Sequence, residues 1–378
     1  MKITIVLGAF FPVPPIMGGA IEKTWFALAQ EFARRGHDVV QISRAIPQFP
    51  RTEIIDGVTH IRVGGFDSPA SLLWLKALDL LYSSRVMRIL PQADIIVTNT
   101  FWLPLLLRDS TRGAVYVHVA RFPKGQMRFY QRAARLQTPS SSVARAIIDE
   151  VPSLAANVKV VPYPCPESSD RMEPPPVNTR PKTILYVGRV HPEKGVHLLI
   201  EAFGKLPPEI AAEWMLTIIG PTESRLGGGG ESYRMQLQAA INRTKSRVVL
   251  RGSIFDSSAL EAEFRRARIF VYPSLAEKGE TFGLAPLEAM AQGCAVIVSR
   301  LGCFGDFITD GETGAVFDHR AASASDALAA QLQKFMDDES LAERIAQAGY
   351  RKAKDYSMTE IAGRFLADFE SVVAGQPA

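Results

Sequence analysis

The sequence predicts an α/β protein built from two Rossmann-like domains, and three observations support this prediction. The chain has 378 residues, more than one hydrophobic core ordinarily holds and enough for two domains. It begins with a strand, loop, helix and strand in that order, which predicts a parallel sheet. The same order starts again at Thr183. The composition, 47% hydrophobic and 22% charged, is typical of a folded globular protein.

The first βαβ unit can be followed residue by residue. Residues 3–7 form a buried-strand pattern, residues 20–35 a helical pattern that Gly36 ends, and residues 38–42 the next strand. The intervening loop lacks G-x-G-x-x-G, so it is not a dinucleotide-binding fingerprint. Gly18 and Gly19 instead bring backbone without side chains to a helix start. That arrangement suits a phosphate or a sugar, and a simple turn is the alternative.

The rest of the N-terminal half continues the alternation. Residues 54–63 predict a hairpin that turns at Asp56 and Gly57, and residues 69–90 predict one or two helices. Further strands are expected at 95–98, 114–119 and 158–161. His118 lies at a strand end, where open α/β sheets place ligand-binding groups, although a lone histidine there is commonly structural.

Residues 121–135 interleave basic and aromatic side chains, among them Arg121, Phe122, Lys124 and Arg128. One interpretation is a solvated helix with a buried aromatic face. The other is an interfacial helix that holds this half on an anionic membrane. Residues 1–160 carry 19 Lys and Arg against 11 Asp and Glu, which favours the second interpretation.

The chain therefore divides into four expected parts. Residues 1–163 form the first domain, 164–181 a proline-rich linker, 182–355 the second domain and 356–378 an amphipathic helix. In the second domain, strands are expected at 183–187, 215–219, 248–250, 269–272 and 295–298.

Two motifs in the second half carry chemistry. Arg189 and Lys194 lie in a loop between a strand and a helix, where a guanidinium and an ammonium can neutralise a diphosphate. Glu280 and Glu288 flank a helix that begins near Gly283, whose free N–H groups also suit a diphosphate. Either feature alone is a weak signal, because surface cations and glutamates at this spacing are common.

Together these motifs resemble the retaining glycosyltransferases of the GT4 family. Gly188, Arg189, Lys194 and Gly195 match the family pattern G-R-x4-K-G, and residues 280–293 match its E-x7-E segment. The resemblance implies the GT-B fold, with two Rossmann-like domains whose parallel sheets face across a cleft. It places the acceptor in the N-terminal domain and the nucleotide sugar in the C-terminal one.

The resemblance also implies residue roles. His118 and Glu280 would be catalytic. The donor diphosphate would lie against Arg189, Lys194, Gly18, Gly19, Gly283 and Leu284, and the sugar or ribose against Glu280, Thr281, Phe282 and Glu288. Thr281 and Asp306 depart from the common family residues at their positions.

The expected reaction moves a hexose from a nucleotide-diphosphate sugar, by default UDP-glucose or a relative, to a saccharide or lipid-linked acceptor. GDP-mannose is the nearest competing donor, and cell-surface polysaccharide or glycolipid synthesis is the expected setting. Arg189 and Lys194 would do the work of a metal, so no metal or other cofactor is expected. The alternatives are a nucleotide-sugar 2-epimerase and an inactive GT-B-like membrane scaffold.

Several classes of protein are not indicated. No apolar run reaches the roughly 18 residues of a membrane span, and the N-terminus reads as a strand rather than a secretory signal. The three cysteines are an odd number without metal-ligand spacing, which indicates a reducing cytoplasm and no zinc. No nucleic-acid module is recognisable, so nucleic acid is not an expected partner. We expect a cytoplasmic protein that can be peripheral on the inner face of the plasma membrane.

Overall fold

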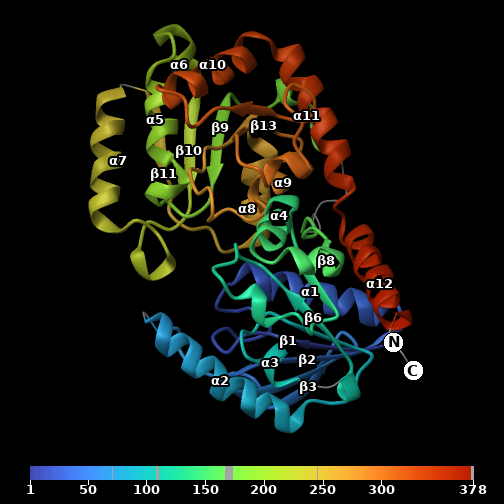
Figure 1. Ribbon diagram of the computed structural model, residues 1–378. Helices are drawn as coiled ribbons and strands as arrows, with labels where there is room; N and C mark the ends of the chain where they lie inside the picture. The colour runs from blue at the N-terminus through green and yellow to red at the C-terminus, as the bar shows by residue number, and fades with distance from the viewer. Residues whose placement is uncertain (70, 108–109, 167–172, 245, 376–378) are drawn as a thin grey trace. The chain divides into compact units, whose positions relative to one another are not determined.

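The computed structural model describes residues 1–69, 71–107, 110–166, 173–244 and 246–375. The chain splits into two compact units (Figure 1). Unit 1 comprises Met1–Pro164 and Met358–Ala378, and unit 2 comprises Cys165–Ser357. In the described part of the chain, no helix combines the length and the apolar character needed to cross a bilayer.

Unit 1 is built on an eight-stranded sheet with the order β3-β4-β2-β1-β5-β6-β7-β8. Only the predicted hairpin, β3 with β4, is antiparallel. The strands are β1 (Lys2–Val6), β2 (Asp38–Ala45), β3 (Thr52–Ile55), β4 (Val58–Gly64), β5 (Ile95–Thr98), β6 (Ala114–His118), β7 (Arg135–Thr138) and β8 (Val158–Val160).

Helices cover both faces of this sheet. The helices of unit 1 are α1 (Ala20–Arg34), α2 (Leu72–Ile89), α3 (Leu103–Leu106), α4 (Ser141–Glu150) and α12 (Met358–Ala374). On one face α1 packs against α12, where the rings of Trp25, Phe32, Phe365 and Phe369 meet. On the other face, α2 and α4 cover a separate apolar core.

The C-terminal helix α12 belongs to unit 1 although it follows unit 2 in the chain. Asp368 on α12 is buried; it accepts a hydrogen bond from the Tyr116 hydroxyl at 2.8 Å and pairs with Arg135 at 2.9 Å. The ring of Phe369 also packs edge-on against Tyr116. A buried charge and an aromatic cluster therefore join α12 to β6 and β7.

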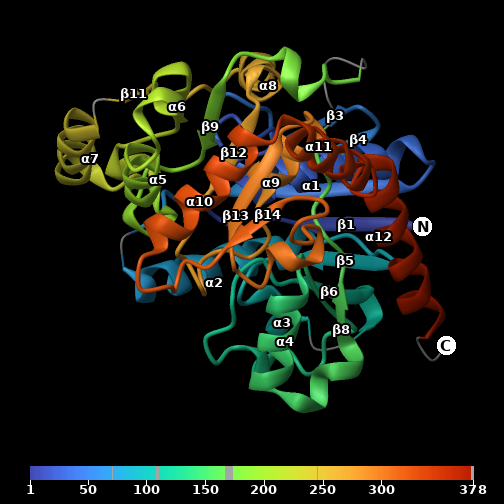
Figure 2. The ribbon, with the colours of Figure 1, turned by 90° about the horizontal axis from the view of Figure 1, so that it is seen from above.

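Unit 2 contains a six-stranded, wholly parallel sheet with the order β11-β10-β9-β12-β13-β14 (Figure 2). In chain order within the unit this is 3-2-1-4-5-6, the Rossmann order. The strands are β9 (Thr183–Val187), β10 (Met215–Ile219), β11 (Arg247–Leu250), β12 (Ile269–Tyr272), β13 (Ala295–Ser299) and β14 (Ala315–Phe317).

Seven helices are described in unit 2: α5 (Val196–Gly204), α6 (Pro208–Glu213), α7 (Gly230–Thr244), α8 (Ser257–Arg266), α9 (Leu284–Ala291), α10 (Ala324–Asp337) and α11 (Glu339–Lys354). Contacts group α5 with α7 and α10, and α9 with α8 and α11. The sheet thus lies between two helical layers, as expected for the predicted doubly wound unit.

The expected linker at 164–181 is attached to unit 2 over the part that is described, and residues 167–172 lie outside the described residues. The buried Arg180 guanidinium donates to the carbonyl of Pro175 at 2.7 Å and to that of Ala267 at 2.9 Å. The Val177 N–H donates to the Glu343 carboxylate at 2.6 Å. Residues 173–181 therefore pack as part of unit 2.

The helix expected at 121–135 was wrong. This stretch is a loop with one 3-10 turn, Met127–Phe129, and Arg135 already belongs to β7. The Glu150 carboxylate at the end of α4 accepts hydrogen bonds from the N–H groups of Gly125 and Met127. A distant side chain thus satisfies backbone donors that a helix would have used internally, and Pro123 and Gly125 disfavour a helix.

Candidate functional site

The two motifs of the second half meet at the centre of the unit 2 sheet. Arg189 and Lys194 follow β9, and Glu280 follows β12. These two strands are neighbours, and the chain moves outward in opposite directions from them. This is the topological switch point of the sheet, outside whose carboxyl ends ligands of such folds bind.

Lys194 and Glu280 form a partly enclosed ion pair. Lys194 Nζ lies 2.7 Å from Glu280 Oε2, and the two side chains are 6% and 11% exposed. Gly195 permits this approach, because a Cβ there would lie 2.0 Å from the Pro273 carbonyl oxygen. The structure therefore brings together two residues that are 86 positions apart in the sequence.

Two stacked tyrosines form the floor beneath this pair. The rings of Tyr186 and Tyr272 are 5.8 Å apart and nearly parallel, and Lys194 Nζ lies 5.7 Å from the centre of the Tyr272 ring. Burial, together with the negative charge of Glu280, raises the pKa of both hydroxyls well above the usual range. Both tyrosines are therefore neutral hydrogen-bonding groups at any physiological pH.

Arg189 is held beside the pair but is more open to solvent. Its guanidinium donates to the Gly227 carbonyl at 2.8 Å and to the Glu193 carboxylate at 2.7 Å. Its side chain remains 44% exposed. The guanidinium is thus oriented by one carbonyl and one carboxylate while part of it faces solvent.

Helix α9 begins at this edge of the sheet, as predicted. Its N-cap is Gly283, with φ of 93°, and Leu284 is its first residue. No side chain caps the helix, and a Cβ on Gly283 would lie 2.5 Å from the Phe304 ring. Only glycine fits here, and the first N–H groups of α9 stay available to an anion.

The remaining donor-site candidates divide by exposure. Thr281 and Glu288 are partly exposed, and Glu288 lies one turn after Leu284 on the same face of α9. Phe282 is buried, with its ring 5.3 Å from that of Phe307. The Phe282 side chain therefore belongs to the core of unit 2, and only its backbone is available to a ligand.

His118 lies in unit 1, at the end of β6, and is buried. Gln137 Oε1 lies 2.5 Å from its Nδ1, and the Tyr163 hydroxyl lies 3.1 Å from its Nε2. Because the Gln137 amide nitrogen donates to Val161, its oxygen faces the histidine, so Nδ1 carries the proton and Nε2 accepts. Burial lowers the pKa of His118 to about 4, so the ring is neutral near pH 7.

Other candidates of unit 1 lie in its loops. Gly18 and Gly19 both have positive φ, 83° and 95°, immediately before α1. Lys124 and Arg128 are exposed in the loop after β6, Arg121 begins that loop, and Phe122 is partly buried.

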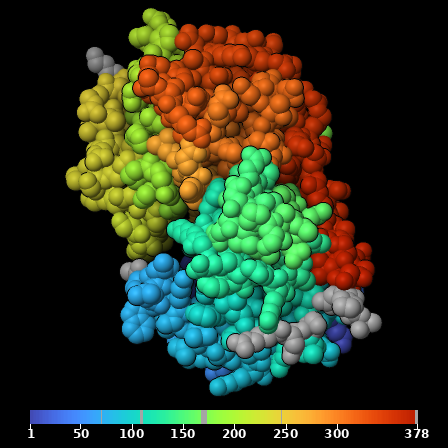
Figure 3. All heavy atoms as spheres, viewed as in Figure 1, coloured from blue at the N-terminus to red at the C-terminus, as the bar shows by residue number. Residues whose placement is uncertain are grey.

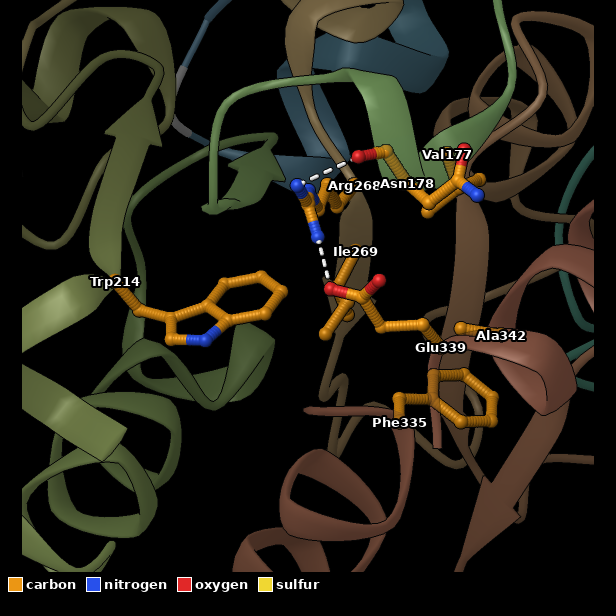
Figure 4. Close-up of a pocket in the computed structure, with 8 residues that line it drawn as sticks. All are labelled: Val177, Asn178, Trp214, Arg268, Ile269, Phe335, Glu339 and Ala342. Carbon is orange, nitrogen blue, oxygen red and sulfur yellow. Dashed lines mark hydrogen bonds and ion pairs between the residues drawn. The ribbon is translucent and has the colours of Figure 1, made fainter. Parts of the chain in front are cut away.

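Two hollows in unit 2 lie away from these residues. A small one of about 10 Å³ is at the amino end of the sheet, where Arg268 binds Glu339 and the Asn178 carbonyl (Figure 4). A wider one of about 570 Å³ lies between α5 and α7. Neither is lined by Arg189, Lys194 or Glu280.

Sequence reasoning missed three contributors to the unit 2 site. Glu193 and Gly227 orient Arg189, and Tyr272 lies under Lys194. Glu193 offered a signal, since it follows Arg189 by four residues within the motif. Gly227 and Tyr272 offered none, because only folding brings them to the carboxyl end of β9. Among the described residues, no three His, Cys, Asp or Glu side chains are grouped as a metal site would require.

Solved structures share this architecture along the whole chain. Sucrose-phosphate synthase from Thermosynechococcus elongatus superposes with a TM-score of 0.79 at 19% identity, covering all of both chains. Anabaena HepE, solved in complex with UDP-glucose, superposes with a TM-score of 0.70 at 18% identity, covering 98% of this chain and all of that one. Two Rossmann-like units of this kind define the GT-B class.

Family comparisons agree with the motifs. Residues 17–166 match Glycosyltransferase Family 4, and residues 168–352 match Glycosyl transferases group 1. The lipopolysaccharide 1,2-N-acetylglucosaminetransferase of Salmonella typhimurium is 26% identical over 96% of this chain and 97% of its own length. The chain belongs to the GT4-type glycosyltransferases of GT-B fold.

Proposed function

We propose that this glycosyltransferase moves a hexose from a UDP-linked sugar to a saccharide or lipid-linked acceptor, with retention of anomeric configuration and without a metal. The observation that carries the proposal is the group formed by Arg189, Lys194 and Glu280 beside the open N-terminus of α9. Two cations and a set of free N–H groups match the charge of a diphosphate.

The choice of donor draws on the relatives. Anabaena HepE was solved with UDP-glucose, and the Salmonella relative is named for transfer of N-acetylglucosamine. Both point to a hexose, and the first to a uridine nucleotide. UDP-glucose or a close relative is therefore the proposed donor, with GDP-mannose as the competitor to be tested.

In the proposed reaction, the bond between the anomeric carbon and the β-phosphate oxygen breaks, and an acceptor oxygen bonds to that carbon. Negative charge develops on the departing UDP, where Arg189, Lys194 and the α9 N–H groups stabilise it. The acceptor's proton passes to the departing phosphate. Glu280, oriented by Lys194, faces the positive charge that develops at the anomeric carbon.

Retention is proposed from family membership. The metal-independent mechanism is proposed because Arg189 and Lys194 supply positive charge where another transferase uses a cation. The acceptor is proposed to be a precursor of a cell-surface polysaccharide or glycolipid, since the Salmonella relative is named for lipopolysaccharide.

A thermal-shift screen tests the donor site directly. UDP, GDP, ADP and their common sugar conjugates are compared with and without EDTA. A ligand at 100 times its dissociation constant should stabilise the fold by roughly 2.7 kcal/mol. We expect UDP and one UDP-sugar to stabilise the protein, EDTA to change nothing, and Arg189→Ala to abolish the shift.

The matched control is Arg234→Ala, which removes an exposed arginine paired with Glu231 on α7 of the same unit. It should leave the UDP shift intact. If no nucleotide stabilises the wild-type chain, the transferase proposal fails and an inactive scaffold is favoured. If UDP-sugar is consumed to an epimer without an acceptor, the 2-epimerase is favoured.

We also propose that unit 1 contacts an anionic membrane on the cytoplasmic face. Helix α2 lies at the surface of unit 1 (Figure 3) and exposes Leu73 and Trp74 by 81% and 64%. Arg85 and Arg88 are exposed on the same helix, whose only acidic residue, Asp79, is buried. An apolar helix end with cations further along matches an anionic lipid surface.

Sedimentation with phosphatidylcholine vesicles, with and without phosphatidylglycerol, tests this proposal. Replacing both Leu73 and Trp74 by Glu should weaken binding to the anionic vesicles by at least about tenfold. Phe255→Glu is the control, because Phe255 is also 81% exposed but lies in unit 2. Equal binding by all three proteins would contradict the membrane proposal.

A further inference from the structure

The carboxyl ends of three neighbouring strands in unit 1 form a second switch point. Strands β1, β5 and β6 are adjacent, and the chain moves outward in opposite directions from β1 and β5. Gly8 follows β1 and Asn99 follows β5, and a Cβ on Gly8 would lie 4.0 Å from Asn99 Oδ1. A ligand of unit 1 is expected at this edge.

Asn99 presents an unsatisfied acceptor at this edge. Its Oδ1 is buried and has no hydrogen-bond partner among the described residues. Buried side-chain oxygens in folded proteins nearly always have a partner. A donor group supplied by a ligand would satisfy this one.

Glu22 supplies a second acceptor, from the first turn of α1. It is only 6% exposed, and its Oε2 lies 2.1 Å from where a Cβ on Gly19 would be. No basic side chain in the described residues lies within ion-pair distance of it. Gly19 must therefore lack a side chain for the carboxyl group to occupy its place.

The surroundings of Glu22 place it over the same edge. Burial raises its pKa, and the positive charge of Arg121, three residues beyond β6, opposes that shift. Glu22 in turn contributes to the raised pKa of Tyr163, whose hydroxyl lies next to His118 at the end of β6. Glu22 thus faces the loops that follow β6 and β8, on the far side of Asn99 from β1.

We propose that Glu22 and Asn99 bind hydroxyl groups of the acceptor sugar in unit 1, an inference that rests on the proposed glycosyltransferase function. Both oxygens only accept hydrogen bonds, and sugar hydroxyls donate them. Arg121 can donate to other sugar oxygens. A phosphate would be repelled by the Glu22 carboxylate, so the group recognised here is a neutral saccharide.

The proposal is tested with the full chain on an array of defined neutral and phosphorylated bacterial oligosaccharides, followed by titration of the strongest binder. We expect a neutral oligosaccharide to bind the wild-type chain. Glu22→Gln and Asn99→Leu should each weaken that binding by about tenfold or more, because each removes one hydrogen-bond acceptor.

Glu31→Gln is the matched control: Glu31 is also buried and lies on α1, but it pairs with Arg34 and Arg35 at the other end of the helix. It should leave saccharide binding within about twofold. Urea unfolding of each variant checks that the fold persists.

The UDP thermal shift separates this inference from the proposed function. If UDP stabilises the wild-type chain but no neutral saccharide binds, or if Glu22→Gln and Asn99→Leu bind as the wild type does, the assignment of this site is overturned. If UDP fails to bind while saccharide binding depends on Glu22, the sugar site stands and the transferase proposal falls.

Discussion

The ion pair between Lys194 and Glu280 combines stability with chemistry. Both side chains are largely buried, so removing one leaves the other as an uncompensated charge. We predict that Lys194→Met destabilises unit 2 by about 3 kcal/mol, measured by urea unfolding.

The double variant Lys194→Met with Glu280→Gln should lose less stability than Lys194→Met alone, because no buried charge is left unpaired. It should nevertheless fail to bind UDP, since a diphosphate-binding cation is gone. A double variant at least as unstable as the single one would show that the pair does not act as a unit.

The neutral state of His118 predicts a pH dependence. Its pKa is about 4 in the folded protein and about 6.5 in an unfolded chain. The unfolded state therefore binds the proton first, and stability that is present above pH 6.5 is lost as the pH falls towards 4. The expected loss is about 3 kcal/mol.

Unfolding by urea at pH 7, 6, 5 and 4.5 measures this loss. His118→Gln should flatten the pH profile of unit 1, whatever its effect on stability at pH 7. His191→Gln is the control, because His191 lies in the other unit and is partly exposed. An unchanged slope in His118→Gln would exclude His118 as the group responsible.

Helix α9 shows how one backbone position can decide whether an element serves a ligand. Gly283 has φ of 93° and lies against Phe304, so an added Cβ is both strained and crowded. We predict that Gly283→Ala destabilises unit 2 by about 1–3 kcal/mol and weakens UDP binding by displacing the start of α9. Calorimetry and UDP titration measure the two effects.

Gly305→Ala provides the matched control, because no atom lies within 4 Å of a Cβ built there and its φ is not in the left-handed region. It should change stability by no more than about 0.5 kcal/mol. Equal effects of the two variants would mean that the α9 start does not depend on Gly283.

For the whole molecule, the division into two units predicts two unfolding transitions. Phe365 on α12 is fully buried among Trp25, Phe32 and Tyr116. Phe365→Ala should lower the transition of unit 1 by about 3–5 kcal/mol and leave the UDP-sensitive transition of unit 2 in place.

Phe255→Ala, at an exposed position in unit 2, should move neither transition by more than about 0.5 kcal/mol. Differential scanning calorimetry with and without UDP identifies which transition belongs to which unit. If Phe365→Ala lowers both transitions equally, the units unfold as one body.

The sequence by itself determined the alternation of strands and helices, the hairpin at Asp56 and Gly57, and the start of α9 at Gly283. These features depend on local physics: hydrophobic period, turn-forming residues and a glycine that ends or begins a helix. The motif around Arg189 and Lys194 was readable for the same reason, because its loop connects β9 to α5 directly.

Only the tertiary structure decided what depends on residues far apart in the chain. Residues 121–135 form a loop because Glu150 takes their backbone donors, and Lys194 meets Glu280 because β9 and β12 are neighbours in the sheet. Glu22 and Asn99 carry no local signal, since their place at one sheet edge follows from strand order alone. Spacing in sequence reports local geometry, whereas strand order sets which loops share an edge.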